Sequence, residues 1–192
     1  MNAWIDEFYP GTKLGIGAWN FGAAESLNGA IAIAEVLGIF GQEELHFASF
    51  YPELLPETPG YYAFKMYTNY DNQGGNYGDL AIQAESNFPE VVSAYSSIDL
   101  ENGNLHIILI NRIENVKEFE VEVIWDGFES TGVGAIYQYT GRDLEDFSSD
   151  EDPGITGGPR PMGVNKQILQ LPGYSITHMI LEPSEAPVEN QE

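Results

Sequence analysis

Hydrophobic and polar positions divide the chain into two parts with different patterns. Before residue 80, short apolar runs at 13–16 and 45–51 predict strands, and longer runs at 30–40 and 61–70 predict helices. The run at 30–40 is apolar nearly all round, which is typical of a helix buried between other elements. Short strands that alternate with helices indicate a parallel sheet with helices packed outside it.

From Phe88 onward the pattern predicts strands only. The segment 117–125 alternates most strictly, with Phe119, Val121 and Val123 separated by glutamates. Such alternation places one face of a strand in a core and the other face in water. The further predicted strands are 91–100, 105–111, 134–140 and a long segment at 167–181. Strands that follow one another in this way, separated by turns, predict an antiparallel β-sandwich.

The two patterns together predict an α+β protein with three segments. We expect a β/α segment at 1–85, a β-sandwich at 86–182 and a disordered polar tail at 183–192. The β/α segment is far too short for a closed (β/α)8 barrel, which needs about 250 residues. It is therefore either an addition to the sandwich or the last part of a barrel whose earlier strands lie outside this chain.

The charge of the chain restricts its partners. Seven Lys plus Arg against 30 Asp plus Glu give a formal net charge of −23. A surface this anionic repels phosphate groups, so we expect no binding to nucleic acids or membrane surfaces, whereas neutral sugars are unaffected. No apolar run in the sequence is long enough for a membrane span.

The sequence contains no clear metal-binding or cofactor-binding motif. The chain has no cysteine, and His46, His106 and His178 lie too far apart along the chain for a local zinc motif. The acidic segment 143–152 carries several oxygens that could collect calcium, but acidic runs are usually solvated. We therefore expect no cofactor and keep calcium as the minority interpretation.

Several motifs in the same order resemble the C-terminal portion of glycoside hydrolase family 44. These enzymes are endo-acting β-glucanases and xyloglucanases with a (β/α)8 barrel and an attached β-sandwich. The resemblance extends from about Trp4 to Leu181. The motifs that carry it are YPGTKL (9–14), NFG (20–22), AIAIAEVLGIFG (30–41), AFKMYTNYD (63–71) and HIILIN (106–111).

The resemblance implies that 13–17 and 45–51 are the last two of the eight barrel strands. The fold would then be α+β, with the last two β/α units of a (β/α)8 barrel packed against a C-terminal antiparallel β-sandwich. The family is extracellular. Residues 1–11 nevertheless lack the basic and apolar regions of a signal peptide. We therefore expect that Met1 is not the natural beginning of the protein.

The resemblance also locates the family's catalytic nucleophile, a Glu in the sequence Thr-Glu-Tyr-Asn. That stretch falls on residues 17–20, where Ala18 stands in place of the Glu. The second catalytic Glu lies on an earlier strand that this chain does not contain. Retaining glycosidases need both carboxylates, about 5–5.5 Å apart. We therefore assign no catalytic residue and expect a family 44-like fragment that is inactive as this chain.

Three residues near the predicted strand ends are candidates for sugar binding. Trp19 and Tyr51 carry rings on which a sugar could stack, and Asn20 could hydrogen-bond the substrate, which would be a β-glucan or xyloglucan. Each has a structural alternative: Trp19 and Tyr51 could pack against neighbours, and Asn20 could bond its own backbone. An uncovered helix at 30–40 would favour self-association or pairing with a missing upstream barrel segment.

Other acidic residues are weaker candidates. Glu25 is the nearest acid after Ala18, but a shift of this size along a loop gives a different geometry. Glu35 lies on the apolar helix and is expected to be structural or paired. The alternative function is a non-catalytic carbohydrate-binding or scaffold β-sandwich module, so the sequence leaves open whether the chain acts as an enzyme.

Overall fold

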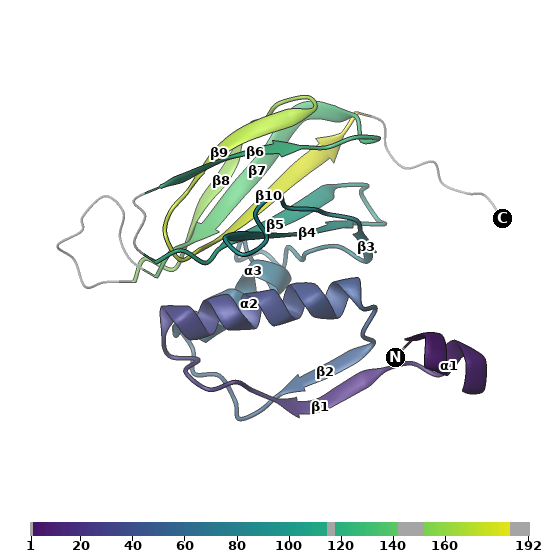
Figure 1. The fold of residues 1–192 in the computed structure, drawn as a ribbon. Helices are drawn as coiled ribbons and strands as arrows, with labels where there is room; N and C mark the ends of the chain where they lie inside the picture. The colour runs from purple at the N-terminus through teal and green to yellow at the C-terminus, as the bar shows by residue number, and fades with distance from the viewer. Residues whose placement is uncertain (1, 115–117, 142–151, 185–192) are drawn as a thin grey trace.

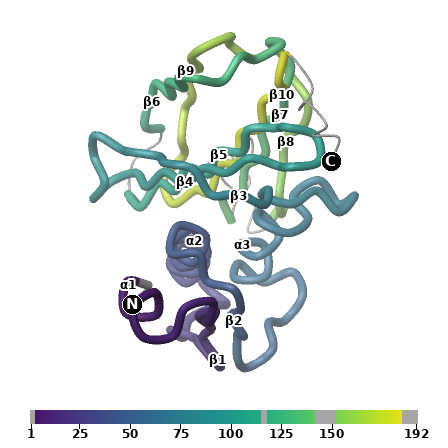
Figure 2. Tube along the Cα trace, turned by 90° about the vertical axis from the view of Figure 1, so that its right-hand side faces the viewer, coloured from purple at the N-terminus to yellow at the C-terminus, as the bar shows by residue number. Residues whose placement is uncertain are grey.

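The computed structural model describes residues 2–114, 118–141 and 152–184, which form a stack of four layers (Figure 1). At the bottom lies a small parallel sheet, and two helices cover it. A six-stranded antiparallel sheet follows, and a two-stranded sheet covers its far face (Figure 2). The short helix α1 (Asn2–Phe8) lies beside the small sheet.

The helical layer consists of α2 (Leu27–Gln42) and α3 (Pro59–Thr68), both of which were predicted. α2 begins three residues earlier than expected because Ser26 caps it: the Ser26 Oγ accepts a hydrogen bond from the Gly29 N–H at 3.1 Å. α3 begins at Pro59, which lacks the N–H that the first turn of a helix leaves unpaired. The two helices pack against each other and bury Ile33 and Met66.

The small sheet pairs β1 (Gly15–Trp19) with β2 (Phe47–Phe50) in parallel. The sequence interpretation ended the first strand at Ile16 and was wrong there. The strand continues through an irregularity between Ile16 and Trp19, and Trp19 is paired with Phe50. A bulge of this kind accommodates an extra residue without ending the strand, so Gly17 lies within β1.

The large sheet has the order β3-β4-β5-β10-β7-β8, with antiparallel pairing throughout. β5 has all seven residues buried because helices cover one of its faces and the β6–β9 pair covers the other. The six strands are β3 (Leu80–Ile82), β4 (Val92–Ile98), β5 (Leu105–Asn111), β7 (Ser130–Tyr139), β8 (Ile155–Pro161) and β10 (Ser175–Pro183), and the covering pair is β6 (Phe119–Ile124) and β9 (Lys166–Leu171).

Three features of this sheet differ from the sequence interpretation. The segment 167–181 is two strands, β9 and β10, separated by a turn at which Tyr174 has a φ of 45°. β8 is absent from the predicted strands because it contains Pro159 and Pro161. Prolines are tolerated there because β8 is an edge strand that pairs only with β7. β3 was not predicted because it is only three residues long. It joins the large sheet although it precedes residue 86, and the division into segments stays a prediction.

Two apolar clusters occupy the spaces between layers. One lies between the helices and the large sheet, and includes Ile108 and Ile110 of β5. The other lies between the large sheet and the β6–β9 pair, and includes Leu105, Ile107 and Leu109 from the opposite face of β5. The strict alternation predicted for β6 is confirmed, since Phe119, Val121 and Val123 pack on the second cluster and the glutamates between them are exposed.

The contact between α2 and β4 is close enough to require glycine at position 38. A Cβ at Gly38 would overlap the ring of Tyr95, and that ring is held in place by a hydrogen bond from its hydroxyl to Glu35 at 2.6 Å. We expect Gly38→Ala to lower the free energy of unfolding by about 2 kcal/mol, as overpacking of a core does.

Gly41 on the same helix is the matched control. A Cβ there meets nothing within 4 Å, so Gly41→Ala should stabilise the protein by up to about 1 kcal/mol through helix propensity. Urea denaturation of both variants measures the difference. Equal effects of the two substitutions would mean that α2 does not pack on β4 through Gly38.

Candidate functional site

The ends of β1 and β2 meet at the place where the sequence indicated a site. The Tyr51 N–H donates a hydrogen bond to the Trp19 carbonyl at 3.2 Å, so the residues after β2 lie beside the end of β1. We call Ala18, Trp19, Asn20, Phe21 and Tyr51 the strand-end site. None of these five side chains is a carboxylate or an imidazole.

Ala18 has an unusual backbone conformation. Its φ is 55°, in the left-handed region that residues with a Cβ rarely adopt. Such a conformation costs of order 1 kcal/mol and persists only where the surrounding structure imposes it, most often at functional sites. The exposed Ala18 methyl group therefore occupies a strained strand end that its own side chain does not explain.

Trp19 is buried, with 7% of its surface exposed. Its ring packs edge-on against Phe50 and Phe40, with centroids 4.9 and 5.2 Å away, and is stacked on Phe64 at 6.0 Å. These contacts give Trp19 a packing role between the small sheet and the helices. Its proposed stacking on a sugar stays a prediction.

The other candidate residues are accessible. Tyr51 is 70% exposed and Phe21 is 68% exposed. Asn20 uses its Oδ1 to accept a hydrogen bond from the Gly22 N–H at 2.7 Å, which is the structural alternative to a substrate contact. Sequence reasoning missed Phe21, although it follows Asn20 directly in the NFG motif. An aromatic residue directly after the end of a predicted strand is the sequence signal that could have identified it.

Glu35 is paired, as predicted. Its carboxylate accepts hydrogen bonds from Ser93 Oγ and Tyr95 Oη, both at 2.6 Å, and lies 3.5 Å from Arg112 Nε. These partners tie α2 to the large sheet, so Glu35 stabilises the layer contact and does not face the strand-end site. Glu25 is exposed in the connection between β1 and α2.

The structure brings two histidines together that lie far apart in sequence. His106 Nδ1 and His178 Nε2 are 3.0 Å apart on the side of the large sheet that faces the helices, and His178 Nδ1 is 3.0 Å from the Met66 carbonyl of α3. A carbonyl only accepts, so His178 donates from Nδ1 and its Nε2 accepts from His106. Burial lowers the pKa of His106 to about 4 and lowers the pKa of His178 well below its ordinary value. Both rings are therefore neutral at pH 7.

No metal site is formed by the part of the chain that the structure describes. No group of three or more His, Asp or Glu side chains in these residues could hold a metal ion. The calcium prediction concerns 143–152, and of these residues only Asp152 is described; its carboxylate accepts a hydrogen bond from Tyr139 Oη at 2.7 Å. Among the described residues, no helix is both long and apolar enough to span a membrane.

The small sheet leaves apolar surface uncovered. Within the described residues, β1 pairs only with β2, so the outer edge of each strand has no partner. Ile16 is 37% exposed and Phe47 is 58% exposed. Open edges beside exposed apolar side chains are a surface on which further strands can add.

The chain is similar to known glycoside hydrolases in sequence and in structure. No protein-family model matches the chain. The chain is 39% identical over 116 residues to the beta-mannanase/endoglucanase A of Caldicellulosiruptor saccharolyticus, a match that covers 58% of this chain and 8% of that protein.

Solved structures match over nearly the whole chain. CelM2, a bifunctional glucanase-xylanase from a metagenome library, superposes with a TM-score of 0.82 at 28% identity, covering 95% of this chain and 33% of that one. Cel44A, a glycoside hydrolase family 44 endoglucanase from Clostridium thermocellum, gives a TM-score of 0.78 at 31% identity, covering 94% of this chain and 34% of that one. The resemblance to family 44 is confirmed, and the chain spans about one third of these structures.

Proposed function

We infer that the chain is the C-terminal unit of a glycoside hydrolase of family 44. The similarity to Cel44A extends over 94% of this chain but only 34% of that enzyme, which supports a unit of a larger enzyme. The hydrolysis of β-1,4-glucan or xyloglucan is then an activity of the larger enzyme, and an extracellular location is proposed on the same basis.

In this proposal β1 and β2 are the last two strands of a (β/α)8 barrel. The observation that carries the proposal is the parallel β1–β2 pair with both outer edges open and apolar side chains exposed on it. Earlier barrel strands would add to these edges, because parallel strands in such barrels are buried on both faces. The large sheet and the β6–β9 pair would form the attached β-sandwich.

The strand-end site then corresponds to part of the catalytic end of the barrel. Ala18 replaces the nucleophile, and its left-handed backbone supports a strand end built for a functional side chain. A methyl group cannot form the covalent glycosyl intermediate of a retaining glycosidase. The unit therefore contributes architecture and sugar contacts and supplies neither catalytic carboxylate.

The purified chain should not hydrolyse soluble β-glucans. The reason is that a retaining mechanism needs two carboxylates and the strand-end site contains none. Reducing-sugar release from xyloglucan and carboxymethyl cellulose is the measurement, with a heat-denatured sample as its control. Release that exceeds this control in a preparation free of host cellulase would show that the chain is an active enzyme.

A second candidate function is a non-catalytic carbohydrate-binding module, and the exposed rings of Tyr51 and Phe21 favour it. Rings with an open face can stack on sugars without any carboxylate. Titration of a cello-oligosaccharide into the wild type and into Tyr51→Ala separates the two functions. Binding that disappears with Tyr51→Ala, without any hydrolysis, supports the module; no binding by the isolated chain rejects it.

A further inference from the structure

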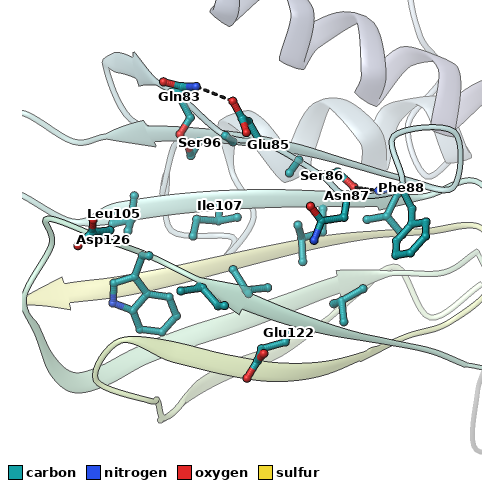
Figure 3. A pocket seen from close by; sticks show the side chains of 18 of the residues that line it. Gln83, Glu85, Ser86, Asn87, Phe88, Ser96, Leu105, Ile107, Glu122 and Asp126 are labelled. Atoms are coloured by element: carbon teal, nitrogen blue, oxygen red, sulfur yellow. Dashed lines mark hydrogen bonds between the residues drawn. The ribbon is translucent and has the colours of Figure 1, made fainter.

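The two faces of the large sheet carry different side chains. The face toward β6 borders a groove that is lined by Ile82, Phe88 and Ile107 among others, and no histidine is among the described residues that line it (Figure 3). The face toward the helices buries His106 and His178, which are 1% and 0% exposed. We call these two residues the histidine pair. They lie outside the strand-end site.

The histidine pair links three elements by hydrogen bonds. His106 of β5 donates from Nδ1 to His178 Nε2, and His178 of β10 donates from Nδ1 to the Met66 carbonyl, each at 3.0 Å. Met66 lies in the last turn of α3, where carbonyl groups lack partners within the helix. The pair therefore caps the end of α3 and attaches it to the large sheet.

One ring atom of the histidine pair has no partner. Because Nδ1 of His106 carries its proton, Nε2 is the bare acceptor of that ring. This atom is buried and has no hydrogen-bond partner among the described residues. A proton added there would create a buried charged N–H without an acceptor, which is costly. Protonation of His106 therefore requires that water reach Nε2.

The histidine pair is covered by residues 69–78, which join α3 to the large sheet and which we call the connecting segment. The ring of Tyr70 packs edge-on against His178, with centroids 4.5 Å apart, and lies 6.2 Å from the ring of His106. The ring of Tyr77 lies 6.0 Å from that of His178. Both tyrosines belong to the connecting segment, so its movement would uncover the pair.

The connecting segment is folded mainly on itself. Asp71 Oδ1 accepts hydrogen bonds from the N–H groups of Gln73 and Gly75 at 2.8 and 2.9 Å. The residues in its middle are polar or glycine, and several are exposed: Asn72, Gln73, Gly74 and Asn76. Apart from its tyrosines, the segment buries little apolar surface. Units of this kind open locally at a lower free energy than the core.

Tyr77 attaches the connecting segment to its surroundings. Its N–H donates to the Tyr67 carbonyl of α3 at 2.9 Å, and its carbonyl accepts a hydrogen bond from Ser97 Oγ of β4. An opening that carries Tyr77 away from His178 breaks both bonds. Exchange of the Tyr77 amide hydrogen therefore reports this opening.

The charges around the histidine pair do not offset its burial. Asp79 and Asp99 raise the pKa of His106, but burial lowers it to about 4. The phenols that face the pair stay neutral in acid, because burial raises the pKa of each; they are Tyr70 and Tyr77 of the connecting segment and Tyr137, which is opposite His178 on β7. Asp71 acts on Tyr70 and Tyr137, and Lys65 of α3 is bonded to Asn72.

We propose that the connecting segment is a pH-dependent device, which covers the histidine pair at neutral pH and opens locally in acid while both sheets stay folded. Opening lets water reach His106, which then binds a proton and holds the segment open. Because the segment joins α3 to the large sheet, acid loosens the contact between these layers. The proposal uses contacts of this chain alone, so its failure leaves the proposed function unaffected.

Amide hydrogen exchange of the purified full chain at pH 7 and pH 5 tests the proposal. The opening constant of the Tyr77 amide, corrected for the intrinsic exchange rate at each pH, should rise at least about twentyfold in acid. This factor follows from a pKa of 6.5 for His106 in the open form and about 4 in the closed form, since only the open form binds the proton at pH 5.

Low concentrations of urea distinguish local opening from global unfolding. A local opening exposes little surface, so urea should leave the Tyr77 opening constant nearly unchanged while it raises the constants of the β5 amides. A Tyr77 constant that is equal at both pH values, or that rises with urea as steeply as those of β5, would overturn the proposal.

His106→Gln assigns the response to the histidine pair, and His46→Gln is its matched control. Glutamine keeps a donor for His178 but does not titrate in this range. The acid response of the wild type should exceed that of His106→Gln by about twentyfold. His46 is exposed, so His46→Gln should respond like the wild type. Equal responses of the wild type and His106→Gln would contradict the device.

Ser97→Ala covers the case in which His106→Gln does not fold. It removes the hydroxyl that is bonded to the Tyr77 carbonyl and keeps both histidines. The Tyr77 opening constant should therefore rise about fivefold at pH 7, with the same further rise in acid as in the wild type. A Tyr77 amide that stays as protected as in the wild type would show that this attachment does not close the segment, and would overturn the proposal.

Discussion

The free energy of unfolding should fall by about 3 kcal/mol between pH 7 and pH 4 because of His106 alone. Burial lowers the pKa of this histidine from its ordinary value of 6.5 to about 4 in the folded protein. Above pH 6.5 both states are neutral at this position. As the pH falls below 6.5, the unfolded chain takes up a proton that the folded protein does not accept, so stability is lost progressively down to about pH 4.

The surroundings of His106 explain why the loss is not compensated. His178 uses its Nε2 to accept the Nδ1 hydrogen bond of His106, and Tyr70 packs edge-on against His178, with centroids 4.5 Å apart. Asp79 and Asp99 raise the pKa of His106, but burial outweighs them. His178, which is deeper, has its pKa lowered further and adds to the loss.

Denaturant unfolding from pH 7 to pH 4 measures this effect, and His106→Gln is the control. Glutamine keeps a donor for His178 and does not titrate in this range. The pH dependence of the wild type should exceed that of His106→Gln by about 3 kcal/mol, while carboxylate titrations affect both proteins alike. Identical pH profiles would mean that His106 is not buried in its neutral form.

Much of the fold followed from local patterns. The alternation around Val121 and the apolar run at 30–40 are periodic over several residues, so they identify β6 and α2 without knowledge of the rest. β8 could not be predicted from the sequence, because its prolines and glycines are tolerated only in a strand at the edge of a sheet. Which strand lies at the edge depends on the tertiary fold. The extension of β1 to Trp19 depends on a bulge and on pairing with Phe50, and neither has a local sequence signal.

The sequence predicted that Trp19, Asn20 and Tyr51 follow neighbouring strands, and the structure places them side by side, but the burial of each side chain could not be predicted. For Asn20 the sequence left a substrate contact and a bond to its own backbone open, and the structure has the backbone bond, from the Gly22 N–H. The burial of Trp19 depends on Phe40, Phe50 and Phe64, which come from three separate elements. The approach of His106 to His178 likewise results from the pairing of β5 with β10, a contact between distant segments.

Restoring a carboxylate at position 18 should have the largest effect on function. In the proposed architecture, Ala18→Glu places a nucleophile at the strained strand end, and the remainder of the barrel supplies the general acid/base. Removal of a nucleophile from a catalytic set usually costs several orders of magnitude in rate. We therefore expect the two forms to differ at least about a thousandfold once the barrel is complete.

The most direct test mixes the unmatched two thirds of CelM2 with this chain, and measures the rate of reducing-end release from a soluble β-glucan. The account predicts that the two parts associate, as size-exclusion chromatography of the same sample would report. It also predicts that the mixture with Ala18→Glu hydrolyses the glucan while the mixture with Ala18 stays at background. Two parts that remain separate, or equal hydrolysis with Ala18 and with Glu, would contradict the assignment of this chain as the C-terminal unit that lacks the nucleophile.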